Sequence, residues 1–285
     1  MSVLVANTIE ECRSAVGRLR PGRRVALVPT MGALHEGHLS LVDLARQRAD
    51  IVVVSVFVNP TQFGPNEDFD RYPRDLDRDV RLAAARGAAI VFAPETRVMY
   101  PQPLLTTVTM RGITDDLEGA HRPGHFDGVL TIVAKLFHVV EPDVAIFGQK
   151  DAQQAAAIRR MVADLDFPIE IVVGPTVREP DGLALSSRNA FLSSADRKEA
   201  LALHAALDRA GSLARQGVDD AKRLLEAMRE ELSRHPEVSI DYVAIVERDS
   251  FRPVRRLSGP AVAAVAAHVG GTRLIDNVVL EPHER

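Results

Sequence analysis

The sequence predicts an α/β protein that contains a parallel sheet with helices on both faces and, after it, a smaller α+β domain. Through the first 175 residues, apolar runs typical of buried strands alternate with helical patterns, as in βαβ units. The run at 51–58 is rich in β-branched residues and shows no polar alternation, as expected of a central parallel strand. Long amphipathic helices and further apolar runs follow. We therefore expect a Rossmann-like domain over residues 1–175 and a smaller C-terminal domain over residues 176–285.

Local signals predict the individual elements. Thr8 and Glu11 have the spacing of a capping box, so a helix is expected over 8–19. Strands are expected at 25–28, 51–58, 88–92, 106–110, 144–147 and 169–173, and helices from residue 35 and at 75–86, 129–137 and 152–163. In the C-terminal part, helices are expected at about 195–215 and 218–234, followed by apolar runs at 240–246, 261–269 and 272–280.

The composition narrows the class of protein. With 35 basic and 39 acidic residues the net charge is −4, so no global basic field recruits nucleic acid. Cys12 is the only cysteine, which excludes internal disulfides and a cysteine-rich zinc site. The apolar run at 3–6 is too short for a signal peptide, and 261–269 falls far short of the ~20 residues of a membrane helix. We expect a soluble, cytoplasmic protein with no membrane or nucleic-acid partner.

The stretch at 25–42 carries the first chemical signal. An apolar strand, a turn punctuated by Pro29 and Gly32, and a helix start at His35-Glu-Gly-His38 follow one another. The free N–H groups of a helix N-terminus bind anions, and two imidazoles three residues apart can both donate to phosphate oxygens. Paired histidines also suggest zinc, but the zincin pattern spaces them four residues apart. The stretch suits a nucleotide triphosphate better, and no protein ligands for a metal are expected.

Two later stretches could supply the basic groups that such a site needs. Gly148-Gln-Lys-Asp151 again follows an apolar strand and precedes a helix, so Lys150 should lie at the same edge of the sheet as the histidines. A plain N-cap role for Asp151 and a solvated Lys150 are the alternative. The stretch Leu185-Ser-Ser-Arg-Asn189 offers two hydroxyls and a guanidinium to oxyanions.

Five stretches, taken together, closely resemble the pantothenate synthetase (pantoate–β-alanine ligase) family, within the HxGH nucleotidyltransferase superfamily. They are Pro-Thr-Met-Gly-Ala-Leu-His-Glu-Gly-His at 29–38, Phe-Val-Asn-Pro-Thr-Gln-Phe at 57–63, Gly-Ala-His-Arg-Pro-Gly-His-Phe-Asp-Gly at 119–128, Phe-Gly-Gln-Lys-Asp at 147–151 and Leu-Ser-Ser-Arg-Asn at 185–189. The resemblance covers nearly the whole chain. It implies that pantoate attacks the α-phosphorus of ATP to give pantoyl adenylate and pyrophosphate, and that β-alanine then displaces AMP to form pantothenate.

The resemblance also implies roles for individual residues. The catalytic set is His35, His38, Lys150 and Arg188, with His38 as the catalytic acid. ATP contacts are implied for Met31, Gly32, Ala33, Leu34, His35, Glu36, Gly37, His38, Gly148, Gln149, Lys150, Asp151, Val177, Leu185, Ser186, Ser187 and Arg188. Gln62 and Gln154 are implied to bind pantoate. Where many family members carry Met before Ser-Ser-Arg, this chain has Leu185, a swap that conserves volume.

Further expectations concern the metal, the assembly and the motion. Mg²⁺ should arrive bound to the phosphates of ATP, with few protein ligands. Asp75, Asp77 and Asp79 could assist it, although a solvated helix face is the simpler interpretation of these residues. The resemblance implies a homodimer. Residues 176–285 should act as a lid that brings phosphate ligands from across the cleft.

Four other classes of function compete with this interpretation. An HxGH enzyme that transfers AMP to a phosphate acceptor would have no need of an amide such as Gln62. A nucleotide-binding regulator would bind ATP without forming pyrophosphate. A zinc hydrolase would contain metal when purified. An aminoacyl-tRNA synthetase shares His-x-Gly-His, but no basic tRNA-binding surface is evident here.

Overall fold

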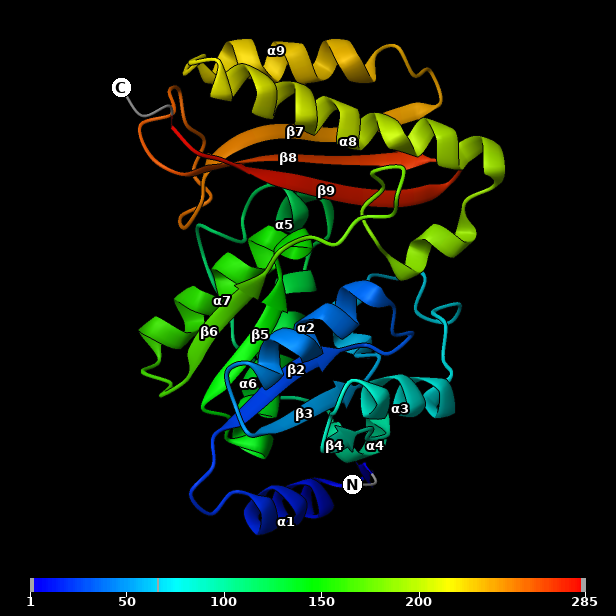
Figure 1. Cartoon of the computed structure of the whole chain (residues 1–285), viewed down its shortest axis with the longest axis vertical. Helices are drawn as coiled ribbons and strands as arrows, with labels where there is room; N and C mark the ends of the chain where they lie inside the picture. Colours follow the sequence, from blue (N-terminus) through cyan, green and yellow to red (C-terminus); the bar gives the residue numbers. More distant parts are fainter. Residues whose placement is uncertain (1–2, 66, 283–285) are drawn as a thin grey trace.

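Two sheets form the framework of the chain in the computed structural model, which describes residues 3–65 and 67–282. The larger sheet is parallel, with its six strands in the order β1-β4-β3-β2-β5-β6, and the smaller is antiparallel, in the order β7-β8-β9 (Figure 1). The larger sheet comprises Leu4–Ala6 (β1), Val25–Thr30 (β2), Ile51–Val56 (β3), Ile90–Phe92 (β4), Val144–Gly148 (β5) and Glu170–Gly174 (β6). The smaller comprises Val238–Glu247 (β7), Ala261–Val269 (β8) and Thr272–Leu280 (β9). The predicted fold class is confirmed.

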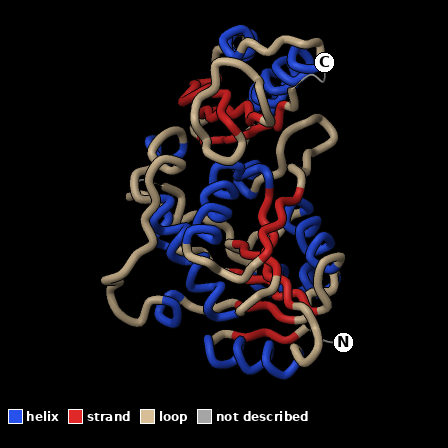
Figure 2. Tube along the Cα trace, turned by 90° about the vertical axis from the view of Figure 1, so that its left-hand side faces the viewer, coloured by secondary structure: helices blue, strands red, loops and turns tan. Residues whose placement is uncertain are grey.

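Helices cover both faces of the larger sheet, as predicted (Figure 2). One face carries α1 (Ile9–Leu19), α6 (His125–Val140) and α7 (Ala152–Asp164), and the other carries α2 (Glu36–Arg46) and α3 (Leu76–Ala85). In β2, Val25 and Leu27 belong to the core beneath α6, whereas Ala26 and Val28 belong to the core beneath α2. Because successive side chains point to opposite faces, a strand covered on both faces must be apolar throughout.

Short elements complete the chain. They are the helices α4 (Thr96–Met99) and α5 (Glu118–His121) and the 3₁₀ turns η1 (Pro60–Gln62), η2 (Gln149–Asp151) and η3 (Ser187–Phe191). Helix α6 begins at His125, four residues before the predicted start. Gly124 is its N-cap and has a left-handed φ of 81°, which glycine adopts without strain. The short strand β1 was not predicted; three residues are too few for a periodic pattern, and it is fixed by pairing with β4.

The strand predicted at 106–110 is wrong. The segment is a loop, and the Val108 N–H donates to Thr131 Oγ1 at 2.9 Å rather than to a neighbouring strand. Its composition favours a strand, but no strand of the described part of the chain pairs with it. Leu105, just before it, is 98% exposed.

In the C-terminal part, α8 (Ser194–Arg215) and α9 (Ala221–Leu232) cover the outer face of the smaller sheet (Figure 1). The other face of that sheet meets the N-terminal part. Strand β8 is buried on both sides: Ala263 and Val265 pack towards the two helices, while Val262 and Ala264 share a core with α7. Short alanine side chains allow both layers to approach this strand closely.

The strand order fixes where a ligand can bind. The chain passes from β2 to β3 on one side, whereas β5 pairs with the other side of β2. The loops that follow β2 and β5 therefore diverge and leave a crevice at the carboxyl edge of the sheet, the usual ligand site of such folds. These loops are residues 31–35 and the turn η2, the two stretches singled out from the sequence.

Candidate active site

The turn between β2 and α2 is held in an unusual conformation by a buried carboxylate. Gly32 and Ala33 have φ of 88° and 50°, in the left-handed region. The N–H groups of Ala33 and Leu34 donate to Asp79 at 2.9 and 2.7 Å. Asp79 lies on α3 and is 1% exposed, so the solvated face proposed for it is wrong. Because an L residue at positive φ is strained, this carboxylate stabilises the turn by satisfying two N–H groups.

The two histidines of the motif stack at the start of α2. Their ring centroids lie 4.1 Å apart, and the His35 N–H donates to Nδ1 of His38 at 3.4 Å. A side chain at Gly37 would have its Cβ only 2.9 Å from Cε1 of His35, so the motif requires glycine between the imidazoles. Since Nδ1 of His38 accepts this bond, neutral His38 carries its proton on Nε2 and can donate it towards a ligand.

Both imidazoles are neutral at pH 7. Burial lowers the pKa of His38 to about 3, helped by His35 and by the ammonium of Lys150. Burial and the same ammonium lower the pKa of His35 to about 4. Nδ1 of His35 is buried and has no hydrogen-bond partner within residues 3–65 and 67–282. The pair therefore offers neutral hydrogen-bonding groups in a positively charged setting.

A cavity of about 170 Å³ lies beside His38. It brings together both glutamines that were predicted to bind the acid, Gln62 from η1 and Gln154 from α7. Gln62 is oriented by its neighbours: its Oε1 accepts from Asn59 at 3.1 Å and its Nε2 donates to Sδ of Met31 at 3.1 Å. The apolar part of the wall is formed by Phe57, Val129, Ile132, Val133, Leu136 and Phe147. The cavity suits a small acid with a branched apolar centre.

A second cavity, of about 570 Å³, lies between the two sheets. Lys150 and Asp151 reach it from the larger sheet, and Ser186 and Arg188 reach it from the C-terminal part. Asp151, Gln154 and Arg188 line both cavities, which therefore adjoin. Lys150 is 21% exposed, and its Nζ lies 3.6 Å from the Asp151 carboxylate. A small acid in one cavity would lie next to a larger, more polar ligand in the other.

Arg188 lies where the two cavities adjoin and forms an ion pair with Asp68. Its Nε and Nη2 each lie 2.8 Å from an oxygen of Asp68, in the loop after β3. Burial opposes the charge of Arg188, but the Asp68 carboxylate raises its pKa above the ordinary value. Ser187 Oγ donates to the Tyr72 hydroxyl at 3.2 Å, and Ser186 Oγ accepts from the Arg188 N–H at 3.2 Å. The predicted hydroxyls thus position η3 itself.

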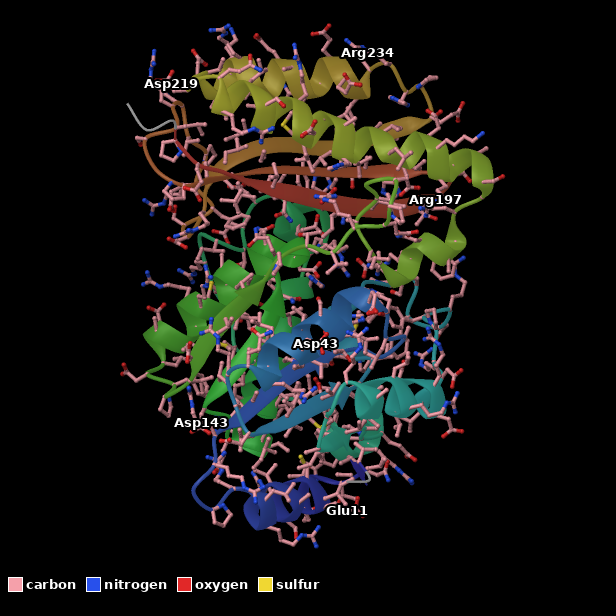
Figure 3. The ribbon with its side chains drawn as sticks, viewed as in Figure 1. Glu11, Asp43, Asp143, Arg197, Asp219 and Arg234 are labelled. Atoms are coloured by element: carbon pink, nitrogen blue, oxygen red, sulfur yellow. The ribbon has the colours of Figure 1, made fainter. Side chains whose placement is uncertain are left out.

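Val177 and Leu185, two other predicted ATP contacts, lie side by side at the base of the hairpin formed by residues 177–185. The Leu185 N–H donates to the Val177 carbonyl at 3.0 Å, and Arg178 pairs with Ala184. A Cβ at Gly37 would lie 3.7 Å from the Cβ of Leu185, so this hairpin approaches the start of α2. Arg197 of α8, labelled in Figure 3, forms ion pairs with Glu179 and Asp181 and so fixes the hairpin.

Several residues of the site were missed by sequence reasoning. Glu67 binds Arg122 through both oxygens at 2.7 and 2.6 Å, beside His125, whose pKa is lowered to about 4 by burial. Arg122 and His125 line both cavities. Arg122 and His125 both lie in the family-like stretch at 119–128, which was the available signal. Glu67, the partner of Arg122, lies in no such stretch.

Two further observations concern metal-binding groups and membrane-spanning helices in the described residues. No group of three or more His, Cys, Asp or Glu side chains within residues 3–65 and 67–282 is placed to hold a metal ion. In the same part of the chain, none of the helices combines the length and apolar character that crossing a membrane requires.

Comparison with known proteins identifies the family. The family model described as pantoate-beta-alanine ligase matches residues 4–279. Pantothenate synthetase from Moorella thermoacetica is 55% identical over 278 residues, covering 97% of this chain and 98% of that protein. The crystal structure of pantothenate synthetase from Thermus thermophilus is 48% identical, covers 98% of this chain and 100% of its own, and superposes with a TM-score of 0.94. Pantoate-beta-alanine ligase from Francisella tularensis, complexed with beta-gamma ATP and beta-alanine, is 33% identical with a TM-score of 0.79 and covers 97% of both chains. The chain belongs to the pantoate–β-alanine ligase family.

Proposed function

We propose that the chain is an AMP-forming ligase that condenses pantoate with β-alanine to pantothenate through a pantoyl adenylate. The observation that carries this proposal is the junction of the two cavities, with His38, Gln62 and Gln154 around the smaller and Lys150 and Arg188 at the larger. Membership of the family over residues 4–279 supports the reaction class. The adjoining cavities support the order of events, because an acid and a triphosphate can meet there.

The smaller cavity is the proposed pantoate site. The two methyl groups of pantoate match the apolar wall, and its hydroxyl and carboxylate groups match the neutral amides of Gln62 and Gln154. The contact from Gln62 Nε2 to the Met31 sulfur is weak, because a thioether is a poor acceptor, so a substrate oxygen can replace it.

ATP is proposed to lie along the start of α2 with its phosphates towards Lys150 and Arg188. Support comes from the free N–H groups of the helix and from the approach of Leu185, which is hydrogen-bonded to Val177, to Gly37. The ammonium of Lys150, which lowers both histidine pKa values, adds to it. Mg²⁺ is proposed to be carried on the phosphates, where it would neutralise the leaving pyrophosphate. Asp151, whose carboxylate is 47% exposed beside Lys150, is the residue that fits it.

In the proposed first step, a pantoate carboxylate oxygen attacks the α-phosphorus, and the bond from that phosphorus to the bridging oxygen of pyrophosphate breaks. Negative charge grows on the α-phosphate and the leaving group, so the step depends on fixed donors. His38 is proposed to donate through Nε2–H as a neutral imidazole, because its pKa of about 3 leaves it uncharged, with a single ring proton, at pH 7. Lys150 and Arg188 add charge. The β-alanine amine then attacks the acyl carbon and AMP leaves.

We propose that the C-terminal part closes over ATP mainly at one edge. Residues 186–188 attach there through the ion pair with Asp68 and the Tyr72 hydroxyl, which are polar contacts that can be exchanged. On the opposite side Val262 and Ala264 of β8 share an apolar core with α7. Large apolar contacts resist relative motion, so this side is the proposed pivot.

A homodimer and a cytoplasmic location complete the proposal. The dimer is supported by the segment 103–110, which has the composition of a strand, lacks a partner strand in the described chain, and exposes Leu105. A second copy of the chain could cover it. The location is supported by Cys12, a buried cysteine that forms no disulfide.

Exchange of labelled pyrophosphate into ATP tests the proposed function. Because the carboxylate is activated before the amine is needed, exchange should require pantoate and proceed without β-alanine. A nucleotide-binding regulator would show no exchange, and a phosphate-acceptor adenylyltransferase would need its own phosphorylated acceptor. Exchange that depends on β-alanine would contradict the two-step mechanism.

A further inference from the structure

One side chain of the smaller sheet reaches the turn that carries Lys150. Asn277, on β9, is 5% exposed and donates through Nδ2 to the carbonyls of Gln149 and Lys150 at 3.0 and 2.8 Å. Its Oδ1 accepts from Nε2 of Gln149 at 3.0 Å. All three contacts lie within η2, and together they use both N–H groups and the oxygen of the Asn277 amide.

Asp276, the residue before Asn277, holds the loop that bears Val177 and Arg178. Asp276 is 4% exposed and binds the guanidinium of Arg178 at 2.6 and 3.0 Å. Arg178 follows Val177 directly in the sequence. Its Oδ1 also accepts from the Asn277 N–H at 2.7 Å. Two adjacent residues of β9 therefore fix two loops from different parts of the chain, one bearing Lys150 and the other bearing Val177.

The direction of these bonds matters for the Lys150 side chain. A 3₁₀ turn of three residues has few internal hydrogen bonds, so its carbonyls need outside donors. By holding the carbonyls of Gln149 and Lys150, Asn277 fixes the orientation of the backbone from which the ammonium projects. Lys150 lies near enough to His35 and His38 to lower both pKa values, so a displaced turn would alter the charge at that site.

We infer that Asn277 is a positioning residue for adenylation, which acts by holding the turn that places Lys150. Asn277 also lines the larger cavity, but its amide N–H groups and oxygen are already used by Gln149 and Lys150, so its effect is assigned to the backbone of η2. The inference rests on the proposed function, because it assigns Lys150 to the adenylation step. It extends the site into a strand whose sequence contains no motif.

A double-mutant cycle separates this role from simple support of the fold. Asn277→Ala should slow pyrophosphate exchange by about 10²-fold, since small displacements of a catalytic group have effects of that order. Its KM for pantoate should stay within about twofold of wild type. Lys150→Gln should also slow exchange, and adding Asn277→Ala to it should cause little further loss, because the residue it positions is gone. Equal losses in both backgrounds would overturn the inference.

A structural control and a second readout keep the test decisive. Leu232→Ala, at the buried last residue of α9, should lower the melting temperature while leaving exchange per folded molecule unchanged at a permissive temperature. Imidazole titration by NMR should show the pKa of His35 and His38 rising in Asn277→Ala, as the ammonium moves away, but not in Leu232→Ala. Unchanged titration in Asn277→Ala would contradict the role. Asn277→Ser serves the same test if the alanine variant does not fold.

The two levels of the proposal fail differently. If wild-type protein shows no pantoate-dependent exchange, the proposed function is wrong. If wild type exchanges and the cycle is additive, only the role of Asn277 is wrong.

Discussion

Arg188 and Asp68 form a side-on ion pair across the two parts of the chain, with both contacts at 2.8 Å. Burial raises the pKa of Asp68, but the hydrogen bonds and charge of Arg188 outweigh it, so the pKa lies below the usual range. A carboxylate thus occupies the guanidinium that the proposed function assigns to phosphate.

This pairing predicts opposite effects for its two members. Arg188→Ala should slow pyrophosphate exchange by about 10²–10³-fold and release more pantoyl adenylate to water. Asp68→Asn should lower the KM for ATP by about fivefold, because an ion pair worth roughly 1 kcal/mol no longer competes with phosphate. Asp43 (labelled in Figure 3) is one of two carboxylates that bind Arg86, the other being Glu36, and it lines neither cavity, so Asp43→Asn should change neither value. A raised KM in Asp68→Asn would instead show that the carboxylate orients Arg188.

Asp79 should control ATP binding through the β2–α2 turn. Asp79→Asn offers an amide N–H where a backbone N–H needs an acceptor, which costs about 1–3 kcal/mol. We expect a lower melting temperature and a KM for ATP raised about tenfold. Asp75→Asn weakens the cap of the same helix but does not touch the turn, so its KM for ATP should stay near wild type. Steady-state kinetics with ATP as the varied substrate distinguishes the two.

Gln62 should matter for the acid and not for the nucleotide. Removing one or two hydrogen bonds by Gln62→Ala should raise the KM for pantoate by about 5–100-fold. The KM for ATP should change far less, since the side chain lines only the smaller cavity. Gln102→Ala, at an exposed glutamine, is the matched control. Equal losses for both substrates would exclude the assignment.

The exposed leucine at 105 gives a test of assembly. If 103–110 lies in a dimer interface, Leu105→Asp should shift the protein towards monomer in light scattering, because a buried charge without a partner is costly. Leu165, 54% exposed after α7, provides the comparison, and Leu165→Asp should leave the mass unchanged. A monomeric wild type would refute the dimer.

The lowered histidine pKa values predict a loss of stability in mild acid. Between pH 6.5 and about 4, His35 and His38 bind protons when unfolded and remain neutral when folded, so the free energy of unfolding falls as the pH drops. In His38→Gln, the decrease in melting temperature from pH 7 to pH 5 should be smaller by about 4–8 °C, which corresponds to ~2 kcal/mol. His138→Gln, at an exposed histidine, should keep the wild-type decrease. An equal decrease in all three proteins would rule out this coupling.

The sequence predicted those parts of the site whose residues are close together along the chain. The glycine between His35 and His38, and the place of Lys150 after β5, follow from strand–turn–helix patterns. The wrong strand at 106–110 has a different cause: composition favours a strand, but a strand also needs a neighbour. Local patterns contain no information about that neighbour.

The supporting contacts could not be predicted, because they join distant segments. Asp79 lies 46 residues from Ala33, Asp68 lies 120 residues from Arg188, and Asn277 lies 127 residues from Lys150. An aspartate on an amphipathic helix resembles a solvent-exposed one until the packing of α3 buries it. The family resemblance covered the residues assigned to ligands, whereas these contacts act on the backbone around them.

The double burial of β8 has a consequence for how the chain can be divided. A fragment ending near residue 175 would leave the core of α7 without Phe251, Val262 and Ala264, and would present an apolar patch to water. The complementary fragment would expose the face of β8 that packs against α7, which carries Val262 and Ala264. We therefore expect the two sheets to unfold together, and we expect a chain cut at the predicted boundary of 175 to yield fragments that fold poorly.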